Sequence, residues 1–338
     1  MLAEIEVARP SSNPLDVVRD ERLTDEEARY VSASRAANTV RGYATDWRAW
    51  CAWAEANGHP VMPADDTGIA RWLTSMADSG YKVGTMSRKL SALRFAHRTH
   101  GAPDATQTAR VLTVWEGIRR VHSAPPEQSA ALYPNELWDV IDNLPSTWSS
   151  KRRIHEADLA GLRDRVLLLV GWVGALRRSE LSAIQTTDLA EHPNGLVLSL
   201  PRSKTNQTGD RAELVVLPRA RMPQHCPVTA VRQWCEAAGI TDGPLLRTVS
   251  SGNRAGGVTL GAQGINLSVK SAVARIGLDP TRFSAHSLRA GFVTYAHLRG
   301  SSDRAIAHQT RHRSLATLGM YIRVSAAWDD NAATGLGL

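Results

Sequence analysis

The feature that most constrains the fold of this 338-residue chain is a proline-rich break near its middle. Pro125 and Pro126 stand side by side in a stretch of small and polar residues, and adjacent prolines do not continue a helix. Segments with a helical hydrophobic period lie on both sides of this break. The length of the chain also favours two domains over one. We therefore predict a linker at 123–135 that joins a domain at 31–122 to a domain at 136–324.

The first domain is expected to be entirely helical. Four segments carry apolar residues three or four positions apart, and the first two begin at a capping residue and end at a glycine. Four tryptophans follow this spacing, namely Trp47, Trp50, Trp72 and Trp115. We expect them in a hydrophobic core, and the alternative is a surface on which bases stack.

One helix of this domain, at about residues 85–99, combines an apolar face with a cationic one. The cationic face carries Arg88, Lys89, Arg94, His97 and Arg98. Such a helix can lie along a DNA groove, where its charges meet the phosphates. We therefore take Arg88, Lys89 and Arg94 as candidate DNA contacts. The alternative is an ordinary solvated face.

The second domain is expected to be mostly helical, with one β-hairpin. A mostly apolar helix at about 159–174 should be buried at its centre. Strand-like alternation occurs only at 195–200 and 211–217, and the turn-rich segment between them predicts a hairpin that presents Lys204. The glycine-rich segment 250–257 matches no phosphate-binding pattern and is expected to be a mobile loop.

The two ends of the chain are expected to lie outside the domains. Residues 1–30 are polar and contain Pro10 and Pro14, which predicts a flexible arm. Residues 325–338 form a short tail in which Trp328 stands among acidic and small residues. The N-terminus has neither the basic nor the apolar region of a secretory signal.

Composition argues against several classes of protein. Three cysteines, Cys51, Cys226 and Cys235, are too few for a disulfide framework and suit a reducing compartment. Two of them lie near His225, but no paired Cys-x-x-Cys spacing supports a metal site. The longest apolar run, 166–176, is about half the length that a membrane helix needs. We expect a cytoplasmic protein without a membrane span, and its formal net charge of +7 allows a polyanionic partner.

The segment with the richest chemistry lies near the C-terminus, at 286–323. It contains His-Ser-Leu-Arg, Arg-His-Arg and Met-Tyr-Ile-Arg, and so gathers two imidazoles, several guanidiniums and the phenol of Tyr321. A phenol is a weak nucleophile at neutral pH because its ordinary pKa is about 10. Neighbouring cations favour the phenolate and also stabilise a phosphate under attack. The segment has the parts of a site that attacks phosphodiesters through tyrosine. The alternative is a helical core with a few surface cations.

A second cationic motif, Ala-Leu-Arg-Arg-Ser-Glu-Leu, follows the apolar helix. It places Arg177 and Arg178 at the end of a buried helix, where each charge needs a partner. Glu180 is the candidate partner in the sequence. One of the arginines is expected to point into an anion site from this rigid support.

Taken in order, these motifs resemble those of the tyrosine recombinase (phage integrase) family. The Ala-Leu-Arg-Arg-Ser-Glu-Leu motif is similar to the family's Gly-Leu-Arg-x-x-Glu-Leu box, and His-Ser-Leu-Arg is similar to its His-x-x-Arg box. A hairpin lysine and a histidine followed nine residues later by tyrosine complete the pattern. The matching positions are Arg177, Lys204, His286, Arg289, His312 and Tyr321. The first domain resembles the family's core-binding domain less specifically.

One departure from the family pattern concerns the last motif. Thr310 and Arg311 stand where the family has Leu-Gly before the histidine. A side chain at the glycine position affects the turn that is expected there, but it leaves the expected role of His312 unchanged.

The resemblance implies how the scissile phosphate would be held. Arg177 and Arg289 would clamp its non-bridging oxygens, which suits planar and permanently charged guanidiniums. His312 would add a hydrogen bond to the same phosphate. Glu180 is expected to support an arginine and not to act as a catalyst.

The resemblance also implies the covalent chemistry. Tyr321 would attack phosphorus and form a 3′-phosphotyrosyl link, which conserves the energy of the phosphodiester. Lys204 would give a proton to the leaving 5′ oxygen, and His286 would be a hydrogen-bonding group and possible general base. No ATP, metal or other cofactor is expected.

At the level of assembly, the resemblance implies a clamp of two domains around double-stranded DNA. Four protomers would pair two sites, each an inverted repeat around a core, and exchange strands through a Holliday junction. The tail would dock on a neighbouring protomer with Trp328 as its anchor. Accessory proteins, the target sequence and the choice among integration, excision, resolution and inversion stay open.

Two other functions remain as alternatives. A type IB topoisomerase shares the catalytic arrangement but relaxes supercoils without preference for a site. A non-catalytic DNA-binding protein could be built on the same scaffold, although all six catalytic positions are filled here.

Overall fold

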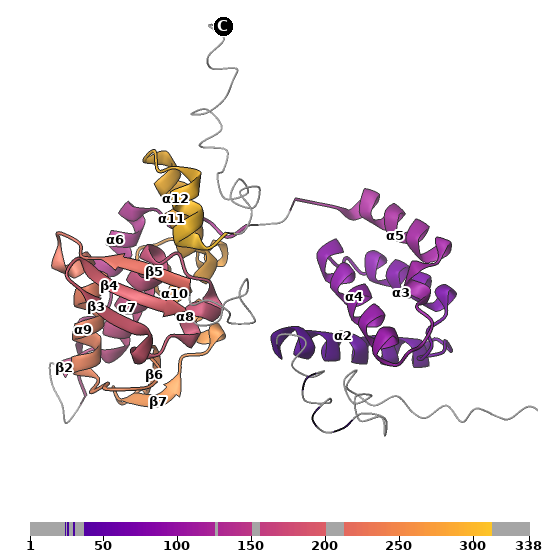
Figure 1. Cartoon of the computed structure of the whole chain (residues 1–338), viewed down its shortest axis with the longest axis horizontal. Helices are drawn as coiled ribbons and strands as arrows, with labels where there is room; N and C mark the ends of the chain where they lie inside the picture. Colours follow the sequence, from indigo (N-terminus) through magenta and orange to yellow (C-terminus); the bar gives the residue numbers. More distant parts are fainter. Residues whose placement is uncertain are drawn as a thin grey trace, which may run out of the picture. The chain divides into compact units, whose positions relative to one another are not determined.

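The chain forms two compact units, Met1–Pro126 and Glu127–Leu338 (Figure 1). The computed structural model describes residues 37–125, 128–150, 156–200 and 213–312, together with Thr24, Glu26 and Tyr30. The division between the units falls inside the linker predicted at 123–135. Most of the predicted arm and the whole predicted tail lie outside the described residues.

Helices make up the described part of the first unit. They are α2 (Ala37–Ala56), α3 (Asp66–Asp78), α4 (Val83–Thr99) and α5 (Ala109–His122), with a short 3-10 turn η2 (Ala105–Gln107) before α5. The predicted cap of α3 is present, because the side chain of Asp65 accepts a hydrogen bond from the backbone N–H of Gly68 at 3.2 Å. The prediction of a helical first domain is confirmed.

Tryptophan side chains form the centre of this unit. Trp47 and Trp50 are 0% exposed and Trp72 is 3% exposed. The rings of Trp50 and Trp72 meet edge to face, with their centroids 5.2 Å apart. The indole N–H of Trp50 donates to the carbonyl of Val61 at 3.0 Å, so its polar atom is satisfied in the core. These three tryptophans are core residues, as predicted, while Trp115 is only partly buried.

The second unit is also mostly helical. Its helices are α6 (Pro134–Asp142), α7 (Leu159–Val173), α8 (Arg178–Ala183), α9 (Pro227–Ala237), α10 (Ala262–Arg275), α11 (Ala285–Leu298) and α12 (Asp303–Thr310), with 3-10 turns η3 (Thr186–Asp188), η4 (Pro223–His225) and η5 (Pro280–Arg282).

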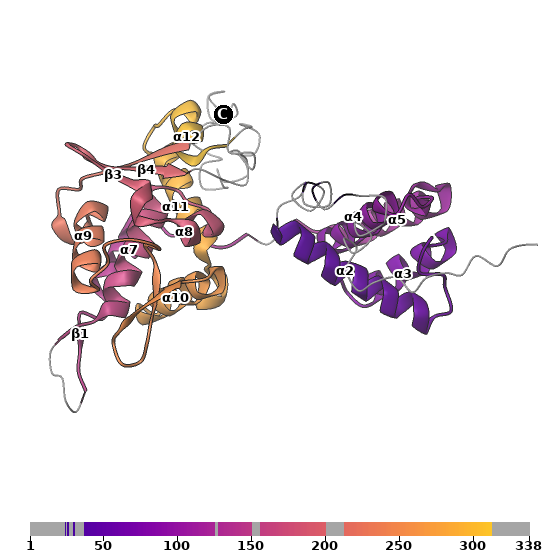
Figure 2. The same cartoon turned by 60° about the horizontal axis from the view of Figure 1, so that its bottom comes forward.

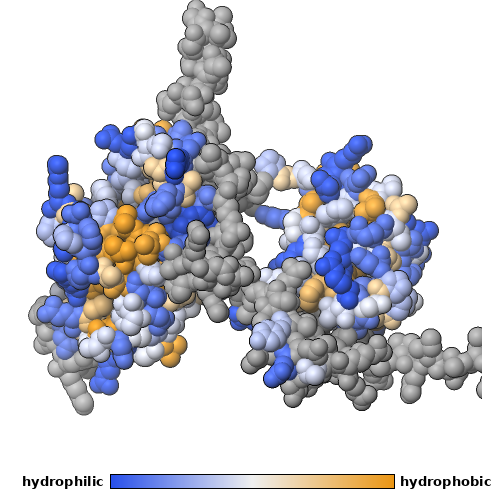
Figure 3. Space-filling model, in the orientation of Figure 1, coloured by the Kyte–Doolittle hydropathy of each residue, from blue (hydrophilic) through white to orange (hydrophobic). Residues whose placement is uncertain are grey.

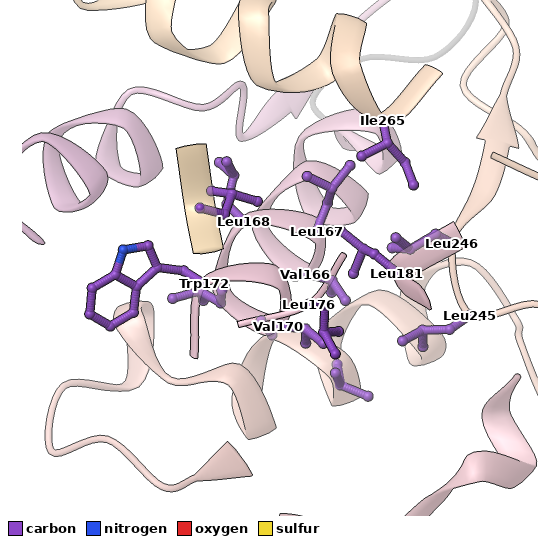
Figure 4. Packing of buried hydrophobic residues seen from close by; sticks show 14 of the residues in the cluster. Val166, Leu167, Leu168, Val170, Trp172, Leu176, Leu181, Leu245, Leu246 and Ile265 are labelled. Atoms are coloured by element: carbon purple, nitrogen blue, oxygen red, sulfur yellow. The ribbon is translucent and has the colours of Figure 1, made fainter. Parts of the chain in front are cut away.

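Helix α7 lies at the centre of this second unit, with α9, α10 and α11 packed on it (Figure 2). Val166, Leu167, Leu168, Leu169 and Val170 are all 0% exposed, so this stretch has no solvent-facing side (Figure 4). A helix that is apolar all round must be buried. The prediction of a buried central helix is therefore confirmed. No helix in the described ranges is long and apolar enough to cross a membrane.

Short antiparallel sheets complete the second unit. The largest has the order β3-β4-β5, formed by β3 (Leu189–His192), β4 (Gly195–Leu200) and β5 (Glu213–Pro218). Strands β4 and β5 are the two predicted ones, and Gly195 pairs with Pro218 at the end of their ladder. Residues 201–212, which include Lys204, lie outside the described residues. The other sheets pair β1 (Thr147–Trp148) with β2 (Glu156–Ala157), and β6 (Arg247–Val249) with β7 (Ala255–Thr259).

The hairpin of β6 and β7 corrects the prediction for 250–257. Part of this glycine-rich segment is a strand, and Asn253 fixes the turn before it. The side-chain amide of Asn253 donates to the carbonyl of Ala157 and its oxygen accepts from the backbone N–H of Leu159, each at 2.9 Å. Hydrogen bonds between backbone groups form this strand. Because glycines have no side chains to alternate along a strand, the sequence shows no strand period here.

The sheet β3-β4-β5 has one buried face and one outward face. On β5, Val215 and Leu217 are 0% exposed, whereas Leu214 and Val216 are each 57% exposed. Figure 3 shows an apolar patch over this part of the sheet. The alternation follows from the period of two along a strand.

The second half of the predicted linker differs from a free connection. Leu132 is 0% exposed, and its backbone N–H donates to the carbonyl of Ser287 at 3.1 Å. Its own carbonyl accepts the indole N–H of Trp172 at 2.9 Å. The segment is an extended strap along α11, which can approach closely because residue 291 is a glycine.

This close approach predicts a large effect for Gly291→Ala. An added Cβ would lie 1.9 Å from the carbonyl oxygen of Leu132 and 2.9 Å from the indole nitrogen of Trp172. We expect a loss of about 1–3 kcal/mol in the free energy of unfolding, from forced displacement of the strap. Urea denaturation of the whole chain, followed by tryptophan fluorescence, measures it.

Gly117→Ala is the matched control, because the same change in α5 meets nothing within 4 Å. It should stabilise the first unit by up to about 1 kcal/mol through helix propensity. Equal stability of Gly291→Ala and the unaltered protein would contradict the described packing.

Candidate active site

A buried carboxylate anchors the beginning of α8. Glu180 is 2% exposed, and its Oε2 accepts the backbone N–H of Arg177 at 2.8 Å. Its Oε1 accepts Nη1 of the same arginine at 2.6 Å. The three-residue spacing brings the carboxylate back over the first turn of the helix, as in a capping box. Glu180 therefore supports Arg177, as the sequence predicted, and Arg178 beside it is exposed.

A second arginine, Arg311, binds the same carboxylate. Its Nη2 donates to Oε2 of Glu180 at 2.8 Å, and both side chains are nearly inaccessible to solvent. Burial by itself raises the pKa of Glu180. The charge of Arg311, together with the hydrogen bonds and charge of Arg177, has a larger effect in the opposite direction, so the pKa of Glu180 lies below its ordinary value. The carboxylate is thus held ionised between two guanidiniums.

Arg289, the candidate arginine of α11, is 0% exposed. Its Nη1 donates to the carbonyl of Ala175, and its Nη2 to the carbonyl of Thr310, each at 2.6 Å. Its Nη2 also lies 3.0 Å from Nε2 of His312. One guanidinium therefore ties together the ends of α7 and α12 and places two candidate catalytic residues in contact.

The hydrogen bonds around His312 fix its tautomer. A guanidinium can only donate, so Nε2 accepts from Arg289. Nδ1 then carries the proton and donates to the hydroxyl of Thr310 at 2.7 Å, while that hydroxyl donates to the carbonyl of Ile306 at 2.7 Å. Burial lowers the pKa of His312 to about 4, assisted by the charges of Arg289, Arg177, Arg311 and His286. His312 is neutral at physiological pH in this arrangement.

Two turns at the site have left-handed backbone at residues other than glycine. Ala175, between α7 and α8, has φ 46°, and Arg311, after α12, has φ 59° and ψ 42°. Both stand where the recombinase motifs have glycine. Among the described residues, Asn253 is the only other non-glycine residue with positive φ. This conformation costs roughly 1–2 kcal/mol for a residue with a Cβ, so tertiary contacts must maintain it.

Arg311 thus adopts a backbone conformation that suits glycine, and its side chain provides the compensating contacts. Its Nη1 donates to the carbonyl of Gln309 at 2.7 Å and lies 3.3 Å from that of Gly174. Its Nη2 lies 3.4 Å from the carbonyl of Ala175, in addition to its bond to Glu180. No function of Arg311 was predicted from the sequence, and the signal for one was a charged residue at a glycine position.

The remaining predicted catalytic residues are placed only in part. His286 lies in the first turn of α11, where its backbone N–H donates to the hydroxyl of Ser284 at 3.1 Å, and it is exposed. Lys204 and Tyr321 lie outside the described residues. The described part of the site thus unites Arg177, Glu180, Arg289 and His312 around the ends of α7 and α12.

The candidate DNA contacts on α4 are not all on a solvated face. The expected cationic face is wrong at two positions, because Lys89, a candidate DNA contact, is 8% exposed and His97, which was expected on the same face, is 0% exposed. Lys89 lies 3.4 Å from the buried carboxylate of Asp46 and above the ring of Trp72. It is buried because α4 packs against α2 as well as α3.

The two candidate arginines of α4 remain accessible. The side chain of Arg88 is 55% exposed and pairs with Asp46 at 2.9 Å. That of Arg94 is 38% exposed and lies 3.6 Å from Asp104. These two side chains, with the exposed Arg98, form the accessible cationic part of the helix.

His225 and Cys226, which are adjacent metal-ligating residue types in the sequence, have other contacts. Nε2 of His225 lies 2.9 Å from a carboxylate oxygen of Asp142, and its ring stacks on Trp138 with centroids 4.5 Å apart. The sulfur of Cys226 accepts the backbone N–H of Ala220 at 3.4 Å. Within the described ranges, no group of three metal-ligating side chains gathers.

Similarity to known proteins extends over nearly the whole chain. Residues 28–99 match the family "Phage integrase, N-terminal SAM-like domain". The chain is 31% identical over 319 residues to the "Integrase/recombinase xerD homolog" of Selenomonas ruminantium, a match that covers 94% of this chain and 90% of that protein. It is 24% identical over 313 residues to "Tyrosine recombinase XerD" of Rhizobium meliloti (strain 1021), covering 89% and 93% of the two chains.

Solved recombinase structures share the fold. The XerH site-specific recombinase bound to a palindromic difH substrate matches with a TM-score of 0.58 and 13% identity, over 92% of this chain and 82% of that one. The Tn1549 transposon integrase in complex with transposon right end DNA matches with a TM-score of 0.61 and 12% identity, over 96% and 98% of the two chains. The predicted fold class is thereby confirmed.

The resemblance inferred from the motifs is confirmed by the extent of the match to the Selenomonas protein: this chain belongs to the tyrosine recombinase (phage integrase) family, site-specific enzymes that cut and rejoin DNA strands.

Proposed function

We propose that this recombinase cleaves DNA through Tyr321, with Arg177, Arg289 and His312 holding the scissile phosphate. The observation that supports this most is the contact between Arg289 and His312, at 3.0 Å, next to an Arg177 held by Glu180. Two guanidiniums from separate elements, those of Arg177 and Arg289, converge beside His312 without DNA. Such preorganised cations stabilise the charge that develops at phosphorus, because they need no rearrangement during the reaction.

Cleavage exchanges one ester bond at phosphorus for another. The phenolic oxygen of Tyr321 forms a bond to phosphorus while the bond to the 5′ oxygen breaks. Lys204 supplies the proton that the leaving oxygen takes up, and His286 accepts the phenolic proton. The products are a 3′-phosphotyrosyl link and a free 5′ hydroxyl, and the reverse step with a second 5′ hydroxyl rejoins the strand.

The neutral imidazole of His312 suggests how binding and chemistry are connected. In the described arrangement its Nε2 accepts from Arg289, so it cannot donate to a phosphate. An anionic phosphate would draw the guanidinium toward itself and favour a proton on Nε2. His312 would then become a donor only when substrate is present.

The DNA substrate is proposed by analogy with the relatives. The XerH structure contains a palindromic difH substrate and the Tn1549 integrase structure contains a transposon end. We propose a short inverted-repeat site in cytoplasmic DNA, bound by protomers that assemble as a tetramer on two paired sites. Similarity to recombinases over most of the chain favours this function over DNA relaxation or simple DNA binding.

Replacement of Tyr321 tests the nucleophile. With a nicked duplex that carries the target site, in EDTA and without ATP, the unaltered protein should become covalently joined to a DNA 3′ end. Tyr321→Phe should bind the duplex but give no adduct on a denaturing gel. Tyr295→Phe is the control and should react normally, since its ring packs near Trp172 in the hydrophobic core. An adduct from Tyr321→Phe would move the nucleophile elsewhere.

The lowered pKa of His312 predicts a dependence of stability on pH. Between its folded value of about 4 and its ordinary value of 6.5, the unfolded chain binds more protons than the folded one. The free energy of unfolding should therefore fall as the pH drops from 6.5 toward 4. His312→Gln should make this decline shallower, as measured by thermal unfolding across that range.

The control for this measurement is His122→Gln, at the exposed end of α5. It should leave the decline unchanged. An unchanged slope in His312→Gln as well would show that His312 is not held neutral by its surroundings.

Replacing neighbouring cations on α4 is expected to have different consequences at different positions. Arg88→Gln and Arg94→Gln should each weaken DNA binding and reduce the slope of log affinity against log salt by about 1 per lost phosphate contact. Lys89→Met should instead lower the stability of the first unit by about 1–3 kcal/mol, because Asp46 loses a buried partner. Salt titrations followed by fluorescence anisotropy measure the change in DNA binding, and urea denaturation measures the change in stability. Salt slopes unchanged in both arginine variants would remove α4 from the interface.

A further inference from the structure

Arg311 carries an interaction that a glycine at the same position could not make. Its backbone is left-handed, and its side chain is buried among the carbonyls that end α7 and α12. Its guanidinium donates to Oε2 of Glu180 at 2.8 Å, the same oxygen that accepts the backbone N–H of Arg177. The other oxygen of Glu180 is left to Nη1 of Arg177.

We propose that Arg311 is a positioning residue for the cleavage reaction, acting on Arg177 through the carboxylate of Glu180. This inference rests on the proposed role of Arg177 at the scissile phosphate. Arg311 binds Oε2 and thereby orients the carboxylate of Glu180. The other oxygen, Oε1, then fixes the direction of the Arg177 guanidinium. Arg311 itself does not contact the phosphate.

The geometry favours positioning over simple filling of space. The oxygen Oε2 accepts the backbone N–H of Arg177, and Arg311 adds a second donor to the same oxygen, which further restricts rotation of the carboxylate. Arg311 follows the last residue of α12, whereas Glu180 lies in α8 and Arg177 directly precedes that helix. Without Arg311, the carboxylate could turn and the tip of Arg177 would gain freedom. Small errors in the placement of a catalytic group reduce rate steeply.

Arg311 also connects Glu180 and Arg177 to β5, the second strand of the β4-β5 hairpin. Its Nε lies 3.7 Å from Oε2 of Glu213, the first residue of β5. Nearby, the side-chain amide of Gln309 donates to the carbonyls of Val173 and Val216, each at 2.9 Å. The end of α12 is thus fixed to both α7 and β5, which gives Arg311 a rigid base from which to orient Glu180.

The decisive variant is Arg311→Gly. Glycine suits a φ of 59° better than arginine does, so the turn is expected to survive and the protein to fold. Single-turnover cleavage of the nicked duplex should slow by about 10- to 100-fold, with the affinity for that duplex unchanged. A residue that only maintained the fold would change both quantities or neither. Arg311→Lys, which keeps the charge, should recover part of the lost rate.

Two comparisons make the test specific. Arg304→Gln removes one exposed positive charge from the same helix and should cleave at the normal rate. Glu180→Gln removes the charge through which Arg311 acts. Adding Arg311→Gly to Glu180→Gln should therefore cost little more than the slower single variant, because both changes act through one bond.

The outcomes separate this inference from the function on which it rests. Normal cleavage by Arg311→Gly, or losses that multiply in the double variant, would overturn the positioning role and leave the recombinase mechanism intact. Absence of a covalent adduct from the unaltered protein, or normal cleavage by Arg177→Ala, would overturn the proposed mechanism and with it this inference. If Arg311→Gly does not fold, Arg311→Gln is measured by the same criteria.

Discussion

The buried carboxylate of Glu180 is the interaction on which the rest of the site depends. It is shared by Arg177, just before α8, and Arg311, just after α12, and it is held ionised despite its burial. A buried ion pair is weak evidence of stability, because desolvation offsets much of the attraction. Its value here is geometric. Removing the carboxylate would leave two guanidiniums without the anion that they share, and would break a link between the start of α8 and the end of α12.

The backbone around this carboxylate is strained in a way that the side chains explain. Ala175 and Arg311 both adopt left-handed conformations that favour glycine. The carbonyl of Ala175 accepts from Arg289 at 2.6 Å, and this bond holds the turn between α7 and α8 in place. Arg311 stabilises its own turn through its guanidinium. Strained residues persist only where surrounding contacts determine them, and here the same contacts organise the candidate active site.

Much of this architecture could be predicted from the sequence, and the exceptions share a cause. Helical periods and caps located the helices, and ordered motifs located Arg177, Arg289 and His312. The burial of Lys89 could not be predicted, because it depends on Asp46 from another helix. Strand β7 was missed because a glycine-rich strand has no side-chain period. The role of Arg311 required knowledge of a left-handed turn and of a carboxylate 131 positions earlier in the chain.

The ends of α7 and α12 also hold several cations together in the absence of DNA. The last carbonyls of α7 and α12 have no partner within their helices and form the negative ends of the helix dipoles. Arg289 donates to the carbonyls of Ala175 and Thr310, and Arg311 donates to that of Gln309. The guanidiniums are thus neutralised in part by backbone dipoles as well as by one carboxylate. In the proposed mechanism, a phosphate enters a site where Arg177 and Arg289 are already held close to each other, so little of its binding energy is spent on gathering them.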